Sequence, residues 1–488
     1  MKRKLLISIK IVALSLIVSA QNEIDALRYS QSNIFGTAKF SSMSGAYGAL
    51  GGDFSSLSYN PAGIGFYEFN EISFSPVFYY NNVTSYRSTR LENDKIGGNI
   101  GSFGIIFSMP QTNDSKFKRI NIGLGTNMIN TYDHNIRIEG ENNTSSMTDK
   151  ILELANGNTI DNLNPLNTSL AFWTDLIDLQ NNTIDSSLNP QWYLYDNGNY
   201  ISHIKNNSNK LQTKNIRSSG SQHEFIVSLG GSLNEKIYLG ATIGFPTLNY
   251  YELSVYTEDV LEDTINNLEG FSLEEELSTN GDGINIKGGA IIRISENFKI
   301  GASLHSPTYF NIEESYTSAI NTYFSSNNYT EISPSNYFEY ELITPWKGVF
   351  SASAIFNKYI LLSADLEIVD YSFTKLNSAS YDFRYENEAI QNSYQKTNNF
   401  RIGSEINFDE IKIRAGYSKY GSPYTNNDFY QEGYSFGIGL NRNNYFLDIA
   451  YTLSQNNEEH KLYSEEYINP TLIINTNHNI LLTLGIRY

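Results

Sequence analysis

Apolar and polar residues alternate in many short stretches along this chain, and turns or longer polar segments separate the stretches. In residues 236–249, Ile237, Leu239, Ile243 and Phe245 share one side, and the residues between them share the other. A period of two is that of a β-strand with two different faces. In a bilayer such strands must close into a barrel, because every backbone N–H and C=O needs a partner within the protein. The pattern therefore predicts an all-β fold, a transmembrane antiparallel β-barrel.

Fourteen stretches fit this description, with ends defined to about two to four residues. They are residues 69–80, 99–109, 118–130, 223–233, 236–249, 283–294, 298–308, 346–356, 359–371, 399–407, 411–420, 433–442, 445–453 and 477–488. The connections after even-numbered strands are short, and those after odd-numbered strands are long and polar. This asymmetry is typical of outer-membrane barrels, whose short turns face the periplasm and whose long loops face outward.

The amino terminus has the features of a secretory signal peptide. Lys2, Arg3 and Lys4 precede an apolar run, and a small-residue cleavage site ends at Ala20. The alternative is an uncleaved membrane anchor, but the run is shorter than the roughly 20 residues that a spanning helix needs. We therefore expect residues 1–20 to be removed during export.

Composition narrows the partners and the chemistry. The chain has no cysteine, which excludes disulfides, thiolate metal sites and cysteine nucleophiles. Its net charge of −18 would become −22 after cleavage, because the signal peptide carries four positive charges. Nucleic acid would be repelled by such a chain unless it had a concentrated basic patch, and none is evident. The sequence predicts neither a cofactor nor a nucleic-acid partner.

The last predicted strand carries a candidate assembly signal. Ile480, Leu482, Leu484 and Ile486 lie on the same side as the terminal Tyr488. A C-terminal aromatic strand resembles the signal that the barrel-assembly machinery of bacterial outer membranes recognises. The alternative is an ordinary edge strand that ends in tyrosine.

The longest interruption of the strand pattern, residues 131–222, has helical features. Ser146 with Asp149 three residues later predicts a capped helix that ends at Gly157, and a second apolar stripe follows at helical spacing. We expect the two helices to lie on the outer rim and to capture ligand through apolar side chains, unless these only pack the helices onto the barrel. The candidates are Leu166, Leu170, Phe172, Trp173, Leu176 and Ile177.

Residues 41–65, before the first strand, are rich in small side chains. Asn60 and Pro61, followed by Ala62 and Gly63, predict a fixed turn whose side-chain amide could bond the barrel wall. A flexible linker is the simpler interpretation.

This stretch resembles the outer-membrane long-chain fatty acid transporter family, which also includes aromatic-hydrocarbon transporters and shares the Asn-Pro-Ala-Gly turn. Further matches follow at residues 363–367 with 370–371, 401–405, 414–417, and 437–440 leading to 448–451. The resemblance implies a plug, or hatch, at residues 21–68 inside a 14-strand barrel formed by residues 69–488. The longer, asparagine-rich loops depart from the better-known members and leave the ligand open. We interpret the chain as a member of the type found in the Bacteroidetes lineage.

Charged residues also occur on predicted strands. If the neighbouring apolar residues face lipid, these carboxylates and guanidinium groups face the lumen, where they can pair. The simplest role is to brace the lumen and anchor the hatch, and the alternative is gating or binding of a ligand headgroup. They are Asp365, Glu367, Arg401, Glu405 and Arg414.

No catalytic or metal-binding set is evident. The six histidines are scattered, mostly in loops or at strand ends, and the acidic run Glu274 to Glu276 lacks the spacing of a calcium loop. We therefore expect a protein that is not an enzyme and that has no metal site.

The resemblance implies transport of hydrophobic compounds, most of all long-chain fatty acids, across the outer membrane. Members capture the molecule at the surface, let it diffuse passively past the hatch and release it sideways into the membrane lipid. The expected partners are the hydrophobic ligand, outer-membrane lipid and, during biogenesis, the barrel-assembly machinery. The alternatives are a protein-secretion shuttle resembling the same family and a structural or adhesive barrel.

Overall fold

The computed structural model describes residues 23–87, 89–111, 115–180, 198–205, 207–262, 264–425, 431–464 and 467–488. The predicted signal peptide, residues 1–20, lies outside the described residues. Among the described residues, no helix is long and apolar enough to cross a membrane.

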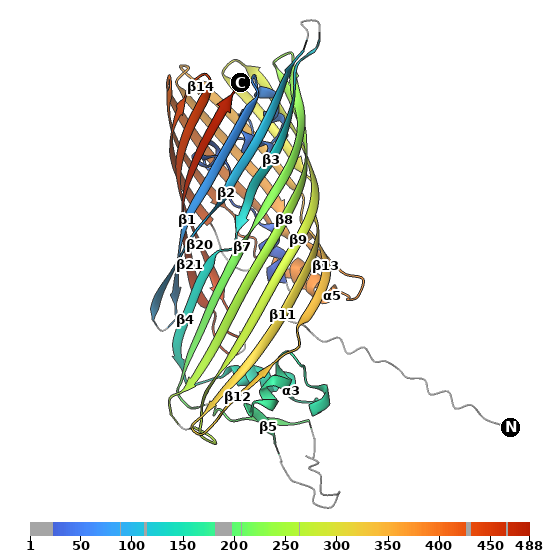
Figure 1. Ribbon diagram of the computed structural model, residues 1–488, viewed down its shortest axis with the longest axis vertical. Coiled ribbons are helices and arrows are strands. Elements are labelled where there is room, and N and C mark those ends of the chain that lie inside the picture. Colours follow the sequence, from blue (N-terminus) through green and yellow to red (C-terminus); the bar gives the residue numbers. More distant parts are fainter. Residues whose placement is uncertain are drawn as a thin grey trace, which may run out of the picture.

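Fourteen antiparallel strands close into a barrel (Figure 1). The ring closes where the last strand pairs with the first, from Glu71↔Arg487 to Tyr86↔Leu472. The predicted fold class is confirmed, and each predicted strand overlaps one strand of the ring. In ring order the strands are β1 (Glu71–Tyr86), β2 (Arg90–Pro110), β3 (Phe117–Thr131), β7 (Lys210–Leu233), β8 (Ile237–Val260), β9 (Leu268–Ser295), β10 (Phe298–His305), β14 (Lys347–Phe356), β15 (Ile360–Asp370), β17 (Lys396–Phe408), β18 (Ile411–Tyr420), β19 (Gln431–Asn441), β20 (Tyr445–His460) and β21 (Thr471–Arg487).

Shorter strands extend the wall toward the long loops. β4 (His134–Asn142) follows β3 and pairs with β7, while β11 (Tyr309–Phe324) follows β10 and pairs with β9. β13 (Asn336–Ile343) pairs with β11, and β12 (Asn328–Ile332) and β16 (Lys375–Asn377) are small additions. The wall is therefore taller on the side of β7, β8, β9 and β11.

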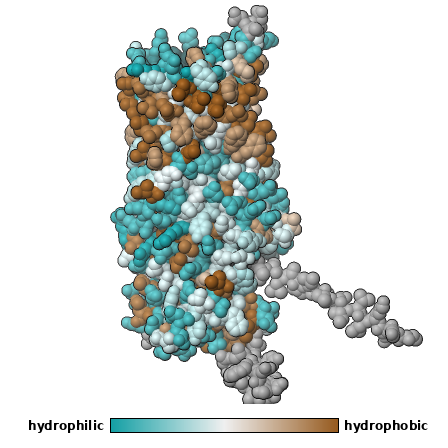
Figure 2. Space-filling model, viewed as in Figure 1, coloured by the Kyte–Doolittle hydropathy of each residue, from teal (hydrophilic) through white to brown (hydrophobic). Residues whose placement is uncertain are grey.

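A band of apolar side chains crosses the part of the barrel nearest the short turns, on the face that Figure 2 shows. Its members face outward and are at least a third exposed, as expected for side chains that meet lipid. They include Phe74, Phe107, Leu229, Leu239, Ile292, Phe350, Phe400, Ile413, Phe436, Ile449 and Leu484. β8 has 24 residues and β9 has 28, although roughly 9 to 11 suffice to cross a bilayer. The strands thus project far beyond the apolar band on the long-loop side.

Two short turns adopt the geometry that tight hairpins favour. Asn234 and Glu235 have φ of 51° and 56°, and Asn357 and Lys358 have φ of 50° and 65°. Consecutive left-handed residues form the type I′ turn, whose twist matches that of the strands. The short connections predicted between these strands are therefore tight two-residue hairpins.

Residues 23–66, here called the lumenal segment, lie inside the barrel. The segment contains α1 (Glu23–Ser30), α2 (Ala38–Ser41) and two 3-10 helices, η1 (Phe54–Ser58) and η2 (Pro61–Phe66). Wall side chains bond its backbone from around the ring, for example Asn121 of β3 to Ile64 O at 2.7 Å and Ser435 of β19 to Ser42 O at 2.9 Å. The lumen is therefore filled at the level of the apolar band.

A cap covers the far end of the barrel (Figure 1). It contains α3 (Met147–Ala155), η3 (Ile160–Asn162), α4 (Thr168–Trp173), β5 (Ile177–Leu179) and β6 (Tyr200–Ser202). Its apolar side chains pack against wall residues such as Tyr256, Phe271 and Ile320. Nearer the middle of the barrel, η4 (Tyr371–Phe373) and α5 (Arg384–Ser393) connect β15 to β17, and α5 contacts α1 (Figure 1).

Candidate functional site

The Asn60 turn, residues 60–63 of the lumenal segment, packs against the barrel wall. The side chain of Asn60 is 1 % exposed, donates to Gly48 O at 2.6 Å and accepts from Ala62 N at 3.1 Å. Pro61 is the first residue of η2, where its fixed φ suits a helix start. A methyl group added to Gly240 of β8 would overlap Pro61 O. Small residues on the turn and on the wall thus allow their backbones to meet.

A buried acid fixes the middle of the lumenal segment. Asp365 of β15 is 1 % exposed, and its Oδ2 accepts from Gly48 N at 3.0 Å. Gly48 is also close to Ser351 of β14, since a methyl group there would overlap the Ser351 hydroxyl. Gly48 therefore links Asp365 to the Asn60 turn.

The other predicted lumenal charges form buried ion pairs. Arg401 Nη2 lies 2.9 Å from Glu367 Oε2. Arg414 lies between two acids, with Nε 2.6 Å from Glu405 Oε2 and Nη1 2.5 Å from Asp448 Oδ1. Each guanidinium group thus has at least one acid beside it within the lumen, which offsets the cost of burying its charge.

Sequence reasoning missed a third lumenal pair, Glu224 of β7 with Lys287 of β9. Both side chains are buried and point inward, alternating with outward apolar residues such as Phe225 and Ile286. The inward phase of these strands was the signal that could have identified them.

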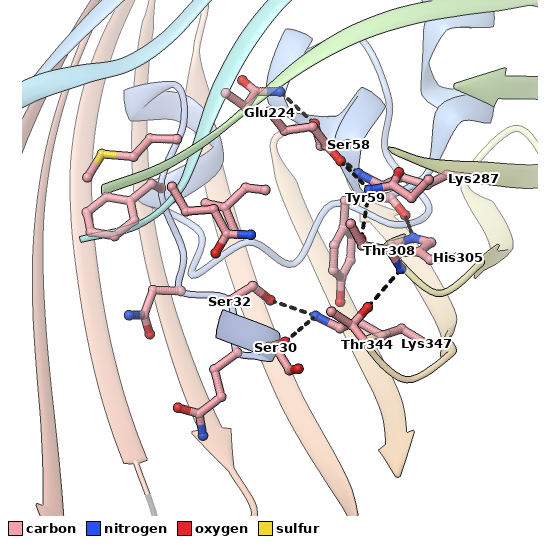
Figure 3. A pocket seen from close by; sticks show the side chains of 18 of the residues that line it. Ser30, Ser32, Ser58, Tyr59, Glu224, Lys287, His305, Thr308, Thr344 and Lys347 are labelled. Atoms are coloured by element: carbon pink, nitrogen blue, oxygen red, sulfur yellow. Dashed lines mark hydrogen bonds and ion pairs between the residues drawn. The ribbon is translucent and has the colours of Figure 1, made fainter. Parts of the chain in front are cut away.

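A cavity of about 130 Å³ lies between the lumenal segment and the wall. One side is polar, with Glu224, Lys287, His305 and Lys347 (Figure 3). The lumenal segment and β3 contribute an apolar lining, from Ile34, Phe35, Phe40 and Met128. The cavity therefore offers separate polar and apolar surfaces to one ligand.

Lys347 is the cation in this cavity that no described acid pairs with. Its Nζ donates weakly to Ser30 O at 3.4 Å and to Ser32 Oγ at 3.2 Å. By contrast, Lys287 pairs with Glu224 and Arg401 pairs with Glu367. The ammonium group of Lys347 can thus accept an anionic partner without breaking an ion pair.

The ladder between β2 and β3 is interrupted beside the cavity. These strands pair only from Ser102↔Asn127 to Pro110↔Arg119. Among the described residues, 90–101 of β2 have ladder partners on β1 alone. A methyl group on Gly101, where the ladder stops, would approach Gly36 O to 2.9 Å. The lumenal segment therefore lies directly behind the interruption.

The predicted helices of the long insertion are present, but they are shorter than expected. α3 has the capping box of Ser146 and Asp149 and ends at Ala155, two residues before Gly157. α4 covers only Thr168–Trp173, and Ile177 belongs to β5. Asn167 caps α4, and Thr174 N bonds back to Leu170 O and Phe172 O, which ends the helix early.

The six candidate capture residues do not form one outward surface. Leu170, Phe172, Leu176 and Ile177 are at most 7 % exposed and belong to the core of the cap. Leu166 is half-buried, while Trp173 is 59 % exposed. Of the six, Trp173 is the side chain that solvent reaches most freely.

Glu258 of β8 ties α3 to the wall. Its side chain is fully buried and accepts from Ser146 Oγ at 2.5 Å, Tyr256 OH at 2.6 Å, Gln212 Nε2 at 3.0 Å and Met147 N at 3.3 Å. Burial raises the pKa of this carboxyl above its ordinary value, although the hydrogen bonds that it accepts oppose the shift. The start of the cap thus depends on one buried acid.

Residues 433–437 read Gly-Tyr-Ser-Phe-Gly, which matches a serine-hydrolase motif. The match lies within β19 and not at a strand-to-helix turn. Ser435 Oγ donates to Ser42 O at 2.9 Å and also bonds Ser44 Oγ at 2.8 Å. This serine anchors the lumenal segment and lacks the setting of a nucleophile.

The comparisons with known proteins identify the fold. No protein-family model matches the sequence, and no curated protein matches it. Solved structures do match. A Pseudomonas aeruginosa FadL homologue is 12 % identical with a TM-score of 0.55, and the match covers 94 % of this chain and 99 % of that chain. The P. putida toluene transporter TodX is 10 % identical with a TM-score of 0.53 over 94 % and 99 % of the two chains.

A third structure, the Ralstonia pickettii toluene transporter TbuX, is 12 % identical with a TM-score of 0.51 over 94 % of this chain and all of the other. At identities this low, the likeness establishes a common fold and nothing about the ligand. Proteins that share a fold can bind different ligands. The chain therefore has the barrel architecture of the FadL homologue and the toluene transporters over almost its whole length.

Proposed function

We propose that this protein is an outer-membrane channel for hydrophobic compounds and that long-chain fatty acids are its main ligands. The observation that carries the proposal is the position of the cavity. It lies between a lumenal segment that fills the barrel and a place where the wall ladder is interrupted. Passage along the axis would require the buried lumenal segment to move as a whole, whereas a side route to the lipid would need only local movement.

The two surfaces of the cavity favour an amphiphile over a neutral hydrocarbon. An anionic headgroup would bind Lys347, and the start of an acyl chain would lie against Phe35 and Met128. The cavity holds only part of a long chain, so the rest would follow the apolar contacts toward the interruption. Each buried CH₂ contributes about 0.8 kcal/mol, which draws such molecules from water without an energy source.

The lumenal segment would act as the hatch. Its contacts with the wall are many but individually modest, and they include the bonds of Gly48 and Asn60. Net hydrogen-bond contributions are about 1 kcal/mol each, so a local shift of the segment is cheaper than opening the barrel. The segment would stay anchored to the wall at its turn, which is formed by Asn60, Pro61, Ala62 and Gly63.

Capture at the surface would involve the cap. Trp173 remains a candidate contact because it is exposed on the cap. The buried members of the predicted set would act only by holding the cap together. Access to the lumen would then pass the side of the cap.

A binding assay on the purified protein tests the ligand class. A labelled long-chain fatty acid should bind the wild type, and Lys347→Met should weaken binding about tenfold, since a hydrogen bond to a charged group is lost. Toluene binding should stay unchanged in Lys347→Met. Equal loss for both ligands would mean that Lys347 shapes the cavity and does not recognise an anion.

Export and assembly complete the proposal. Residues 1–20 would direct the chain to the periplasm, and the barrel-assembly machinery would insert it into the outer membrane. The exposed Tyr488 at the end of the chain, next to β21, supports the second step. Outer-membrane lipid would surround the apolar band and receive the released ligand.

A protein-secretion shuttle is the second candidate. It is favoured by exposed apolar side chains far from the apolar band, namely Trp173 on α4, Ile332 on β12 and Tyr337 on β13. Such side chains are common in surfaces that bind other proteins. Stable co-purification of one defined exported protein, together with failure to bind fatty acid, would favour this function.

A further inference from the structure

The wall has an uncovered edge beside the cap (Figure 1). β12 and residues 336–340 of β13 pair with β11 on one side. On their other side, no strand of the described residues pairs with them, whereas β16 covers residues 341–343 of β13. We call residues 328–332 and 336–340 the open edge. It continues the edge that β16 already extends, and it therefore has the form of a site for a further strand.

The backbone of β12 points to solvent at alternate residues. Ser333 N donates to Ser318 O of β11 at 2.8 Å. Because these directions alternate along an antiparallel strand, Thr330 and Ile332 turn their N–H and C=O groups away from β11. All five residues of β12 are exposed. This row of donors and acceptors is the kind that an extended peptide binds when it adds a strand to a sheet.

The same alternation continues along β13. Ser378 Oγ, just after β16, donates to Glu339 O at 3.1 Å from the side away from β11. Tyr337, two residues earlier, therefore turns its backbone groups to that side. The edge of β16 itself is closed differently. The side-chain amide of Asn387 on α5 accepts from Leu376 N and donates to Leu376 O, each at 2.9 Å. In the described part of the chain, no side chain covers β12 in this way.

Apolar and acidic side chains border the open edge. Ile332 is 68 % exposed and Tyr337 is 77 % exposed. Glu339 lies directly opposite Glu313 of β11, and both are exposed. Like charges that face each other across a ladder destabilise a sheet. A lysine or arginine on an added strand would lie beside Glu339 and offset this repulsion.

We propose that the open edge binds an extended segment of another protein, rich in lysine or arginine, as a further strand of the wall. Pro334, between the two parts of the edge, has no N–H to offer, so the segment bonds each part separately. Its basic side chains meet Glu339 and its apolar side chains meet Ile332 and Tyr337. A second copy of this chain fits poorly, because its own edge would bring the same acids. The inference does not rest on the proposed function, since the cavity and the lumenal segment take no part.

A peptide of repeated Lys-Thr-Lys-Val, fluorescently labelled and eight residues long by design, tests the site on the purified protein. It should bind the wild type, whereas the matched Glu-Thr-Glu-Val peptide should not. Thr330→Pro with Tyr337→Pro removes two N–H groups that point away from β11 and keeps the bonds to β11. This variant should bind the lysine peptide about 25-fold more weakly, at about fivefold for each lost hydrogen bond. Glu339→Lys should reverse the preference between the two peptides.

Two results of this assay would overturn the proposal. A lysine peptide of the same charge with a central proline should bind weakly, and equal binding would mean that charge alone attracts it. Light scattering should show the wild type and the double-proline variant in the same oligomeric state. A dimer that only the wild type forms would mean that a second copy occupies the edge. Heat-modifiable gel mobility checks that each variant is folded.

Amide hydrogen exchange, resolved to single residues, locates the bound peptide. Exchange at Thr330, Ile332 and Tyr337 should slow when the lysine peptide is added. Glu331 is the matched control, because its N–H faces β11 and its exchange should stay unchanged. Unchanged exchange at the three open-edge residues, in the presence of saturating peptide, would overturn the proposal.

Discussion

Asp365 and Gly48 are 317 residues apart in the chain and joined by one hydrogen bond, in which the Gly48 N–H donates to Asp365 Oδ2 at 3.0 Å. Both residues are buried within the lumen. A buried carboxylate needs hydrogen-bond donors, and here the backbone of the lumenal segment supplies one. Asp365 on β15 is therefore one of the side chains that couple the barrel wall to the lumenal segment.

Replacing Asp365 with Ala should loosen the lumenal segment without unfolding the barrel. The variant loses a hydrogen bond to a charged group, worth about 1.5 to 3 kcal/mol. We expect more frequent ion-conducting openings in planar bilayers. Asp365→Asn keeps an acceptor oxygen and should open less often than the Ala variant. Equal conductance of all three proteins would show that Asp365 does not hold the segment.

Asn60→Ala should alter permeability more than stability. The side chain bonds Gly48 O and Ala62 N, and each bond contributes about 1 kcal/mol. We expect faster uptake of a large hydrophilic dye by intact cells, while the heat-modifiable gel mobility of the folded barrel persists. If Asn60→Ala fails to reach the membrane, the turn is needed for assembly and does not control passage.

Two neighbouring side chains of the cap should respond in opposite ways to a negative charge. Leu170 is 5 % exposed, so Leu170→Asp buries an unpaired carboxylate and should make the cap sensitive to protease. Trp173 is 59 % exposed, so Trp173→Asp should leave the cap resistant. If Trp173 contacts ligand, cells that make Trp173→Asp should take up fatty acid more slowly than cells that make the wild type, even though the cap stays resistant to protease. Wild-type uptake with a resistant cap would exclude Trp173 from capture.

The cap should be held more tightly at acidic pH. The pKa of Glu258 is raised above its ordinary 4.5 by burial, so the folded cap binds a proton that the unfolded cap releases. Stability from this group is complete below pH 4.5 and declines as the pH rises through the raised pKa. Exchange of the α3 amides, corrected for intrinsic rates, should therefore quicken as the pH rises from the ordinary pKa of 4.5 through the raised pKa of Glu258. Glu258→Gln cannot titrate and should flatten this profile. If α3 amide exchange in Glu258→Gln still depends on pH, a group other than Glu258 causes the effect.

The membrane part of the barrel was predictable because lipid imposes a strict pattern. On β8, Leu239, Ile243 and Phe245 must be apolar, and the period of two follows directly. Beyond the apolar band both faces of a strand meet water or the cap, and the alternation fades. The prediction consequently ended this strand at Asn249, whereas β8 continues to Val260.

The site was only partly predictable. Inward acids and guanidinium groups, such as Glu367 and Arg401, could be placed from strand phase, but which acid pairs with which guanidinium group came from the structure. The hydrogen bonds of Lys347 to Ser30 and Ser32 depend on how residues 30–32 approach β14, and no local pattern encodes that approach. The place where the β2–β3 ladder stops, at Ser102↔Asn127, is likewise not encoded by a local pattern. Helical spacing from Leu166 to Ile177 was misleading because Thr174 ends α4 early.

Uptake of a labelled long-chain fatty acid by cells with an intact outer membrane tests the central claim most directly. Cells that make the protein should accumulate the label faster than cells that lack it, and excess unlabelled fatty acid should compete. Lys347→Met should reduce the rate while the amount of folded barrel in the membrane stays the same. Equal accumulation with and without a correctly assembled barrel would contradict the account and leave protein secretion as the function to test.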